Sequence, residues 1–197
     1  MADSDEMLLK QIARGDEEAL AVFYRRYESR LFNFIQTKLH DAFEAADILN
    51  EVFLEVWHKA GSFQGRSKVS TWLFSIAYYK VVDRLRKIRP KQLEDEAMAE
   101  IADESPAVLS CLIGGEQAEQ IRHCIQTLSI DHRAVMDLTF FEEMSYSDIA
   151  MVVGCPENTV KTRMFHAKQV MKKCLSRLIG GFTMMAKLDA RSYCHII

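Results

Sequence analysis

The stretch that most constrains this chain is residues 145–175, where two short helical patterns flank a tight break. The break is Gly154-Cys155-Pro156. Glycine suits the left-handed position that ends a helix, and proline suits the first position of the next helix, because its missing N–H would lack a partner there anyway. Ser145 is expected to cap the first helix, with Asp148 three residues on as the acidic partner of a capping box. Short helix, three-residue turn and second helix together predict a helix-turn-helix motif.

The second helix of this motif has two contrasting faces when it is read at 100° per residue. Its apolar face, expected to pack on the first helix, consists of Val160, Met164, Ala167, Met171 and Cys174. Its opposite face and flanks carry Asn158, Thr162, Phe165, His166 and Gln169 together with Lys161, Arg163, Lys168, Lys172 and Lys173. A merely solvated basic face is the alternative. We interpret the helix as DNA-binding, because such polar groups contact base edges and such cations contact phosphates.

The formal net charge of −3 conceals a strongly uneven distribution of charge along the chain. Residues 80–91 are basic apart from Asp83, residues 94–104 are acidic, and residues 161–177 are basic throughout. The pattern indicates two cationic surfaces separated by an anionic connector.

Length and composition are those of an ordinary globular protein. The 197 residues are 49% hydrophobic and 27% charged, with only three prolines, and they suffice for one large or two small domains. No apolar run approaches the roughly 20 residues that cross a bilayer. The acidic start MADSDEM lacks the layout of a signal peptide. We therefore predict a cytoplasmic protein.

The cysteines and histidines carry no recognisable site pattern. Five cysteines are an odd number and form no CxxC pair, which predicts thiols in a reducing compartment and no disulfide framework or zinc site. The six histidines show no metal-ligand spacing. We find no P-loop, GxSxG or dinucleotide fingerprint, so we predict no enzyme, no metal and no cofactor.

The periodicities predict an all-α fold of two small helical domains joined by a flexible acidic linker, the C-terminal domain containing the helix-turn-helix. The predicted divisions are 1–90, the linker 91–116, 117–179 and a tail 180–197. Gly15 is expected to close the first helix, Asp16 to cap the second, and Ser70 to cap the fourth, which follows the loop 61–70.

The fourth predicted helix, residues 71–87, is unusually aromatic and ends in the first basic block. Aromatic rings beside cations can stack on unpaired bases, as in proteins that bind single strands. We expect Trp72 to be core, whereas Tyr78 and Tyr79 are equally compatible with the core and with base stacking.

Several motifs, taken together, resemble the extracytoplasmic-function (ECF) sigma factors of bacterial RNA polymerase. Residues 47–57 (DILNEVFLEVW) resemble the family's D-L-x-Q-E-x-F-x-x-x-W helix, and residues 63–73 resemble F-R-G-x-x-x-x-x-T-W-L. Leu128 with Arg133, residues 146–150 (YSDIA) and residues 159–163 (TVKTR) are similar to L-P-x-x-x-R, Y-x-E-I-A and T-V-K-S-R. Each motif alone is loose, but their order and gaps are specific. The resemblance extends roughly from Leu8 to Leu178.

The resemblance implies three functional surfaces and several partners. RNA polymerase core would dock on Asp47, Asn50 and Glu51. The −10 element would be melted and read by Arg66, Ser67, Lys68, Tyr78, Tyr79, Lys80, Arg84 and Lys87. The −35 element would be read by Asn158, Thr159, Lys161, Thr162, Arg163, Phe165, His166 and Lys168. Core polymerase, promoter DNA and an anti-sigma factor are the implied partners, and the acidic linker would follow the polymerase's RNA-exit path.

Four positions depart from the family pattern. Asn50 stands where Gln is usual, Ala46 where Glu is common, Tyr79 where Asn is common, and His166 where Arg is frequent. These departures mean that the promoter sequence cannot be transferred from a relative. The regulon, the inducing signal and the role of the tail with Cys194 are not specified by the sequence.

Two other functions fit part of the sequence. A helix-turn-helix regulator acting without polymerase would explain residues 145–175 but would leave the motifs at 47–57 and 63–73 as coincidence. A sigma mimic that titrates an anti-sigma factor would not need cationic DNA-binding faces, and this chain has both.

Overall fold

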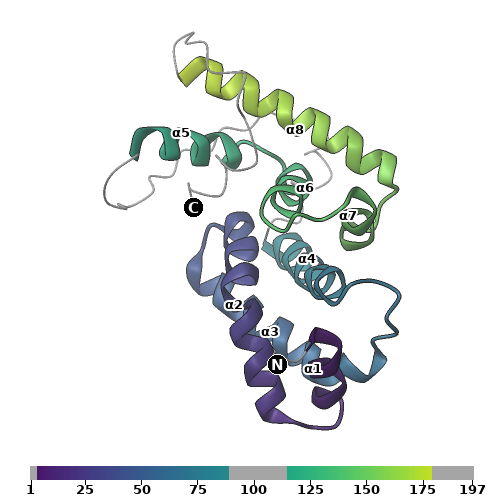
Figure 1. The fold of residues 1–197 in the computed structure, drawn as a ribbon. Coiled ribbons are helices and arrows are strands. Elements are labelled where there is room, and N and C mark those ends of the chain that lie inside the picture. Colours follow the sequence, from purple (N-terminus) through teal and green to yellow (C-terminus); the bar gives the residue numbers. More distant parts are fainter. Residues whose placement is uncertain (1–3, 89–114, 179–197) are drawn as a thin grey trace. The chain divides into compact units, whose positions relative to one another are not determined.

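The structure is a computed structural model that describes residues 4–88 and 115–178 (Figure 1). Within these ranges it contains eight α-helices, one 3₁₀ helix and no strand. The elements are α1 (Asp5–Ile12), α2 (Glu17–Leu39), α3 (Ala42–Lys59), η1 (Ala60–Ser62), α4 (Val69–Ile88), α5 (Gly115–Gln126), α6 (Ile130–Phe140), α7 (Tyr146–Val153) and α8 (Glu157–Leu178). The all-α prediction is confirmed. The tail, and the predicted linker up to residue 114, lie outside the described residues.

The helices group into two compact units. The first contains α1–α4 together with residues 147–155, and the second contains α5, α6 and α8. Among the described residues, no helix combines the length and apolar character of a membrane span.

The first unit is built around α2, which packs against α1, α3 and α4 (Figure 1). Phe23, Leu31, Ile35, Val52 and Phe74 are completely buried and form the centre of its core. Burial of such large side chains is the main source of stability in a small helical domain.

Helix ends in the first unit follow the capping residues of the sequence. Asp16 accepts a hydrogen bond from the Ala19 backbone at 3.0 Å, and Gly15 takes a positive φ of 87° before it, both as predicted. Asp41 similarly caps α3, accepting from the backbone N–H groups of residues 43 and 44. The prediction for Ser70 is wrong: α4 begins at Val69, which places Ser70 inside the first turn.

The break between α7 and α8 is the one that the sequence indicates. Gly154 ends α7 with a positive φ of 67°, a conformation that costs little without a side chain. Helix α7 begins directly after Ser145. Helix α8 begins at Glu157, so Pro156 lies one residue before its first helical position and accepts a hydrogen bond from the Val160 N–H at 3.2 Å.

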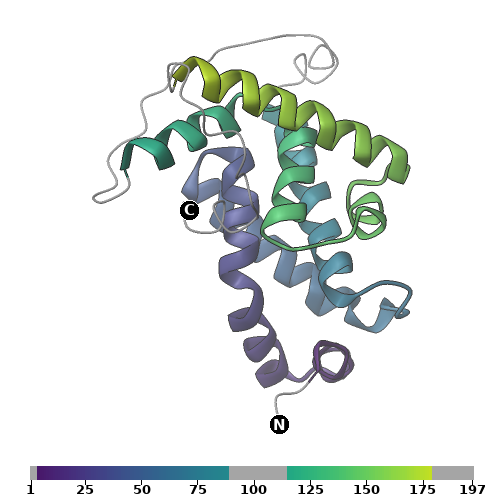
Figure 2. The ribbon, with the colours of Figure 1, turned by 45° about the horizontal axis from the view of Figure 1, so that its top comes forward.

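The second unit is organised by α8, which packs on α5 and α6 (Figure 2). The predicted inner face is confirmed, since Val160, Met164, Ala167 and Met171 are buried. We expected this face to pack on α7, but its main partners are α6 and α5.

Buried Arg133 of α6 ties the end of α5 to α6. Its guanidinium donates to the Gln126 carbonyl at 2.8 Å and to the Leu128 carbonyl at 3.0 Å. Carbonyls at the C-terminal end of a helix lack partners within the helix, so this side chain satisfies groups that would otherwise be buried at a cost. The motif residue Arg133 thus has a structural role in shaping the second unit.

A disulfide joins Cys124 of α5 to Cys174 of α8, with their Cα atoms 5.7 Å apart. The prediction of thiols without disulfides is therefore wrong for this pair. The sequence places Cys174 on the apolar face of its helix, and Cys124 is fully buried in the structure. Their pairing depends on which two inner faces meet across 50 residues of sequence, and residue spacing does not reveal that.

Candidate protein-binding and nucleic-acid-binding surfaces

The first candidate surface is the solvent-exposed side of α3. Asp47, Asn50 and Glu51 are all exposed on this helix, because the residues that interleave with them are the buried ones. Two large apolar side chains extend the same helix surface, Phe43 at 87% exposure and Leu54 at 59%. Exposed carboxylates beside exposed apolar groups are suited to binding another protein.

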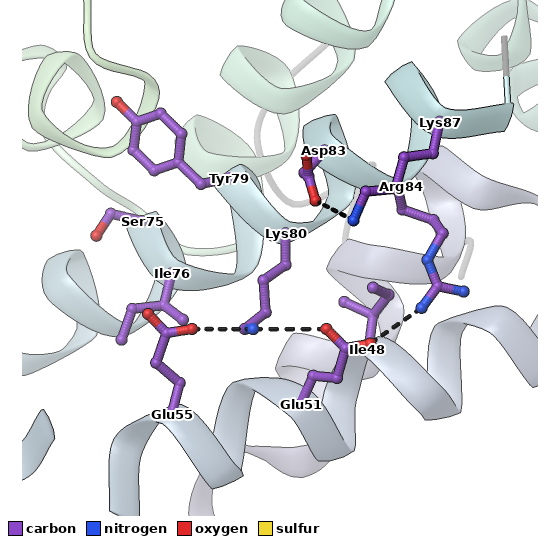
Figure 3. A pocket seen from close by; sticks show the side chains of 10 residues that line it. All are labelled: Ile48, Glu51, Glu55, Ser75, Ile76, Tyr79, Lys80, Asp83, Arg84 and Lys87. Carbon is purple, nitrogen blue, oxygen red and sulfur yellow. Dashed lines mark hydrogen bonds and ion pairs between the residues drawn. The ribbon is translucent and has the colours of Figure 1, made fainter. Parts of the chain in front are cut away.

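Carboxylates of α3 and cations of α4 form a set of ion pairs that we call the α3–α4 ion-pair cluster (Figure 3). Lys80 contacts Glu55 at 2.9 Å and Glu51 at 3.5 Å. Arg84 contacts Glu51 at 3.0 Å and also pairs with Glu44. Glu51 therefore binds two cations at once, and it connects the predicted core-binding surface to the predicted −10-binding helix.

The cluster shifts the pKa of its members in the direction expected for mutual stabilisation. Partial burial acts to raise the pKa of Glu55, but hydrogen bonds from Lys59 and Lys80 outweigh it and hold that pKa below its ordinary value. Partial burial acts to lower the pKa of Lys80, but Glu55 and Glu51 outweigh it and raise that pKa. Both shifts favour the charged forms of Glu55 and Lys80, and because these groups remain partly exposed, each pair contributes at most about 1 kcal/mol.

A groove of about 300 Å³ lies along this cluster between α3 and α4 (Figure 3). Ile48, Ser75 and Ile76 contribute to its lining, and Tyr79 lies at its edge with 54% of its surface exposed. Lys87, another predicted −10 residue, also lines the groove and pairs with Asp83 at 2.8 Å. The groove therefore has charged walls with a single exposed aromatic ring.

The loop before α4 presents the other cations predicted for the −10 element. Arg66 and Lys68 are exposed, and Ser67 between them is partly buried, its hydroxyl donating to the Lys68 carbonyl at 3.3 Å. The rings of Phe63 and Trp72 lie 5.5 Å apart and pack one end of the loop against α4. Partly buried Trp72 thus supports the loop.

The two tyrosines that the sequence left undecided differ in the structure. Tyr78 is 5% exposed, whereas Tyr79 is largely exposed. Their rings meet edge to face with centroids 5.7 Å apart. Only Tyr79 presents a ring face on which a base could stack.

The outer face of α8 is the third candidate surface. Its predicted DNA-contacting residues are exposed except for two partly buried ones, Thr159 and Arg163. The exposed members are Asn158, Lys161, Thr162, Phe165, His166 and Lys168. After Glu157 every charged residue of α8 is cationic. This face combines hydrogen-bonding groups, cations and one apolar ring, the set that a helix uses in a DNA major groove.

Arg163 differs from the other cations of α8 because it pairs with Asp131 of α6 and its side chain is only 24% exposed. Beside this pair, the rings of His132 and His166 lie 6.3 Å apart. The sequence placed Arg163 and His166 on the DNA-binding face, but it gave no sign that α6 contributes Asp131 and His132 next to them.

The surroundings of His132 disfavour its protonated form. Burial is the largest cause that lowers its pKa below the ordinary 6.5, and the neighbouring charges of His166 and Arg163 lower it further. Asp131 acts in the opposite direction without cancelling them.

Some residues of these surfaces were missed or undervalued at the level of sequence. Glu44 and Glu55 are not among the site residues predicted from sequence, and only the packing of α3 on α4 shows that they pair with Arg84 and Lys80. Among the residues that the structure describes, no three His, Cys, Asp or Glu side chains come together as a metal site.

Comparison with known proteins gives these surfaces a family. Residues 23–90 match the family model of sigma-70 region 2, and residues 118–171 match that of sigma-70 region 4. The RNA polymerase sigma-H factor of Pseudomonas aeruginosa is 32% identical over 190 residues, 90% of this chain and 96% of that protein. The ECF sigma factor SigW of Bacillus subtilis is 28% identical over 179 residues, 86% of this chain and 96% of that protein.

Solved structures show the same fold. CnrH, in complex with the cytosolic domain of CnrY, has a TM-score of 0.65 at 22% identity, over 89% of this chain and 99% of that one. The sigma factor RpoE, in complex with the anti-sigma factor NepR from Bartonella quintana, has a TM-score of 0.63 at 23% identity, over 78% of this chain and 96% of that one.

The chain belongs to the sigma-70 family, and within it to the ECF RNA polymerase sigma factors. It is a sigma factor that acts in the initiation of transcription.

The environment of His132 predicts a pH dependence for the stability of the second unit. The unfolded chain takes up a proton near pH 6.5 and the folded chain only at lower pH, so stability should fall as pH drops below about 6.5. His132→Gln should reduce this loss, as measured by amide hydrogen exchange in α6 at about pH 7.5 and 5.5. Exposed His123→Gln is the control; equal pH dependence in both variants would contradict the assignment.

Proposed function

We propose that this sigma factor works in the cytoplasm, docks on RNA polymerase core through α3, and contacts promoter DNA through both units. The loop before α4 and the basic end of α4 bind and open the −10 element, while α8 reads the −35 element. The observation that carries the proposal is the outer face of α8, where hydrogen-bonding side chains alternate with cations and carboxylates are absent after Glu157. A solvated helix face has no need of such segregation.

Docking of core on α3 would use Asp47, Asn50 and Glu51, with Phe43 and Leu54 adding apolar area. Asp47 and Asn50 differ from Glu51, because Glu51 is also engaged by Lys80 and Arg84. Asn50 has a shorter side chain than the Gln usual in this family, so the apolar neighbours carry more of the contact here. Asp47 is therefore the position at which the docking charge can be removed without disturbing the α3–α4 ion-pair cluster.

Two sets of cations in the first unit would bind the −10 DNA, one on the loop before α4 and one on α4 itself. Arg66 is exposed on a loop and can approach a phosphate directly, whereas Lys68, also exposed, is already paired with Asp148 at 3.3 Å. Lys80 and Arg84 lie in the α3–α4 ion-pair cluster, so a phosphate must take the place of Glu51 or Glu55 as their partner. Tyr79, at the edge of the groove, supplies the exposed ring for an unstacked base.

An anti-sigma factor is the further partner that we propose. The solved complex of RpoE with the anti-sigma factor NepR shows that a protein of this fold can be bound in this way. In this chain, the exposed rings Phe43 on α3 and Phe165 on α8 are apolar groups that such a partner would cover.

Replacement of Asp47 by Asn tests the docking surface. Loss of this exposed carboxylate should weaken binding to purified core polymerase by about tenfold, because a charge at a protein interface is lost while the fold remains intact. The measurement is the dissociation constant of the labelled full chain. Glu6→Gln, an exposed carboxylate on α1, is the matched control. Unchanged affinity in the Asp47 variant would contradict the docking surface.

Replacement of Lys161 and Lys168 by Ala tests the −35 surface. Each lost phosphate contact should reduce the slope of log affinity against log salt by about one, because fewer counterions are released. The assay uses upstream duplexes selected from random sequence by the complex of the chain with core polymerase. Lys10→Ala on α1 is the control. If the double variant has the same slope of log affinity against log salt as the control, α8 does not face DNA. Binding to core polymerase should persist in the double variant and in the control.

A further inference from the structure

Cys124 and Cys174, which a disulfide joins in the structure, have no part in the proposed function. Cys124 lies near the end of α5 and is fully buried, whereas Cys174 lies near the end of α8 and is partly exposed. Their Cα atoms are 5.7 Å apart, inside the range that a disulfide spans. Helices α5 and α8 pack on each other around the pair, and this packing accommodates the disulfide.

We propose that Cys124 and Cys174 are a reversible oxidative modification site, at which a hydroperoxide joins α5 covalently to the DNA-reading helix α8. This inference rests on the proposed function, because it assumes that the protein works in the cytoplasm and that α8 reads DNA. Thiols in the cytoplasm are kept reduced, and disulfides that form there are usually transient or redox-sensing. In such a compartment, two thiols close enough to form a disulfide are reduced during ordinary growth. They become linked when the concentration of peroxide rises.

The reaction balances with hydrogen peroxide as the oxidant. The Cys174 thiolate, which is the accessible one, attacks a peroxide oxygen; the O–O bond breaks, hydroxide leaves, and a sulfenic acid forms on Cys174. The Cys124 sulfur then attacks the Cys174 sulfur, the S–O bond breaks, and water leaves. Overall, two thiols and one hydrogen peroxide give one disulfide and two waters. A thiol reductant reverses the bond by thiol–disulfide exchange.

The disulfide changes how firmly α5 is attached to α8. In the reduced protein the two small thiols still pack between the helices, so the fold of the second unit is retained. The disulfide closes a loop of 50 residues that contains α6 and α7, and it prevents α5 from opening away from α8. A second contact holds the end of α5, where Arg133 of α6 donates to the Gln126 carbonyl, and oxidation of the cysteines changes neither group of this contact.

The bond itself is tested by mapping thiols in the full chain. Reduced protein is exposed to hydrogen peroxide, alkylated, digested and analysed by mass spectrometry without reduction. Wild type and Cys155→Ser, whose thiol lies outside the pair, should both yield a linked 124–174 peptide that a thiol reductant removes. Cys174→Ser should yield none. Linkage of Cys124 to another cysteine, or both thiols remaining alkylatable, would overturn the proposal.

The effect of the bond is tested by amide hydrogen exchange of the same samples. Exchange in α5 should be at least about tenfold slower in the oxidised chain than in the reduced chain, and Cys174→Ser should show no change with peroxide. Equal protection of α5 in oxidised and reduced wild type would overturn the claim that the bond controls α5. Neither measurement involves DNA or polymerase, so its failure is distinct from failure of the proposed function.

Discussion

Glu51 binds Lys80 and Arg84 at the same time, and this shared carboxylate constrains the first unit. It lies on the exposed side of α3, beside the residues that we assign to polymerase docking, while its two partners lie on the helix that we assign to −10 DNA. Because one carboxylate balances two cations, any partner that engages Glu51 also alters the charge that α4 presents to DNA. The proposed docking surface and the proposed DNA-binding helix are therefore connected through ordinary ion pairs.

The second unit meets a different constraint, since α8 must present one face outward and remain fixed along the other. Its outward face carries Phe165, His166 and Lys168, and its inner face is held by α5 and α6. Arg163 belongs to both functions: it lies on the predicted DNA-binding side but pairs with Asp131 of α6, and so it orients the helix. His166, which replaces a frequent Arg, lies near His132, so this departure changes the internal environment of the unit as well as its DNA contacts.

Much of this architecture could be predicted from local sequence. Caps such as Asp16, the left-handed Gly154 and the inner stripe of α8 each depend on residues within a few positions of one another. Apart from the local cap predicted at Ser70, the misses share one physical origin, because they depend on which helices pack together. Three pairs come into contact only when helices distant in sequence pack together: Cys124 with Cys174, Asp131 with Arg163, and Glu55 with Lys80. The periodicity of apolar residues does not reveal which helices pack together.

We propose that the two units together direct core polymerase to open a promoter, and run-off transcription measures this activity. Purified core is combined with the full chain on linear templates selected by their complex, and transcripts are mapped to their start. We expect transcripts with one defined start that require the chain, whether the template is fully duplex or already open around the start. Transcription at the level of core alone on both templates would contradict it, and so would transcripts that need an already open template.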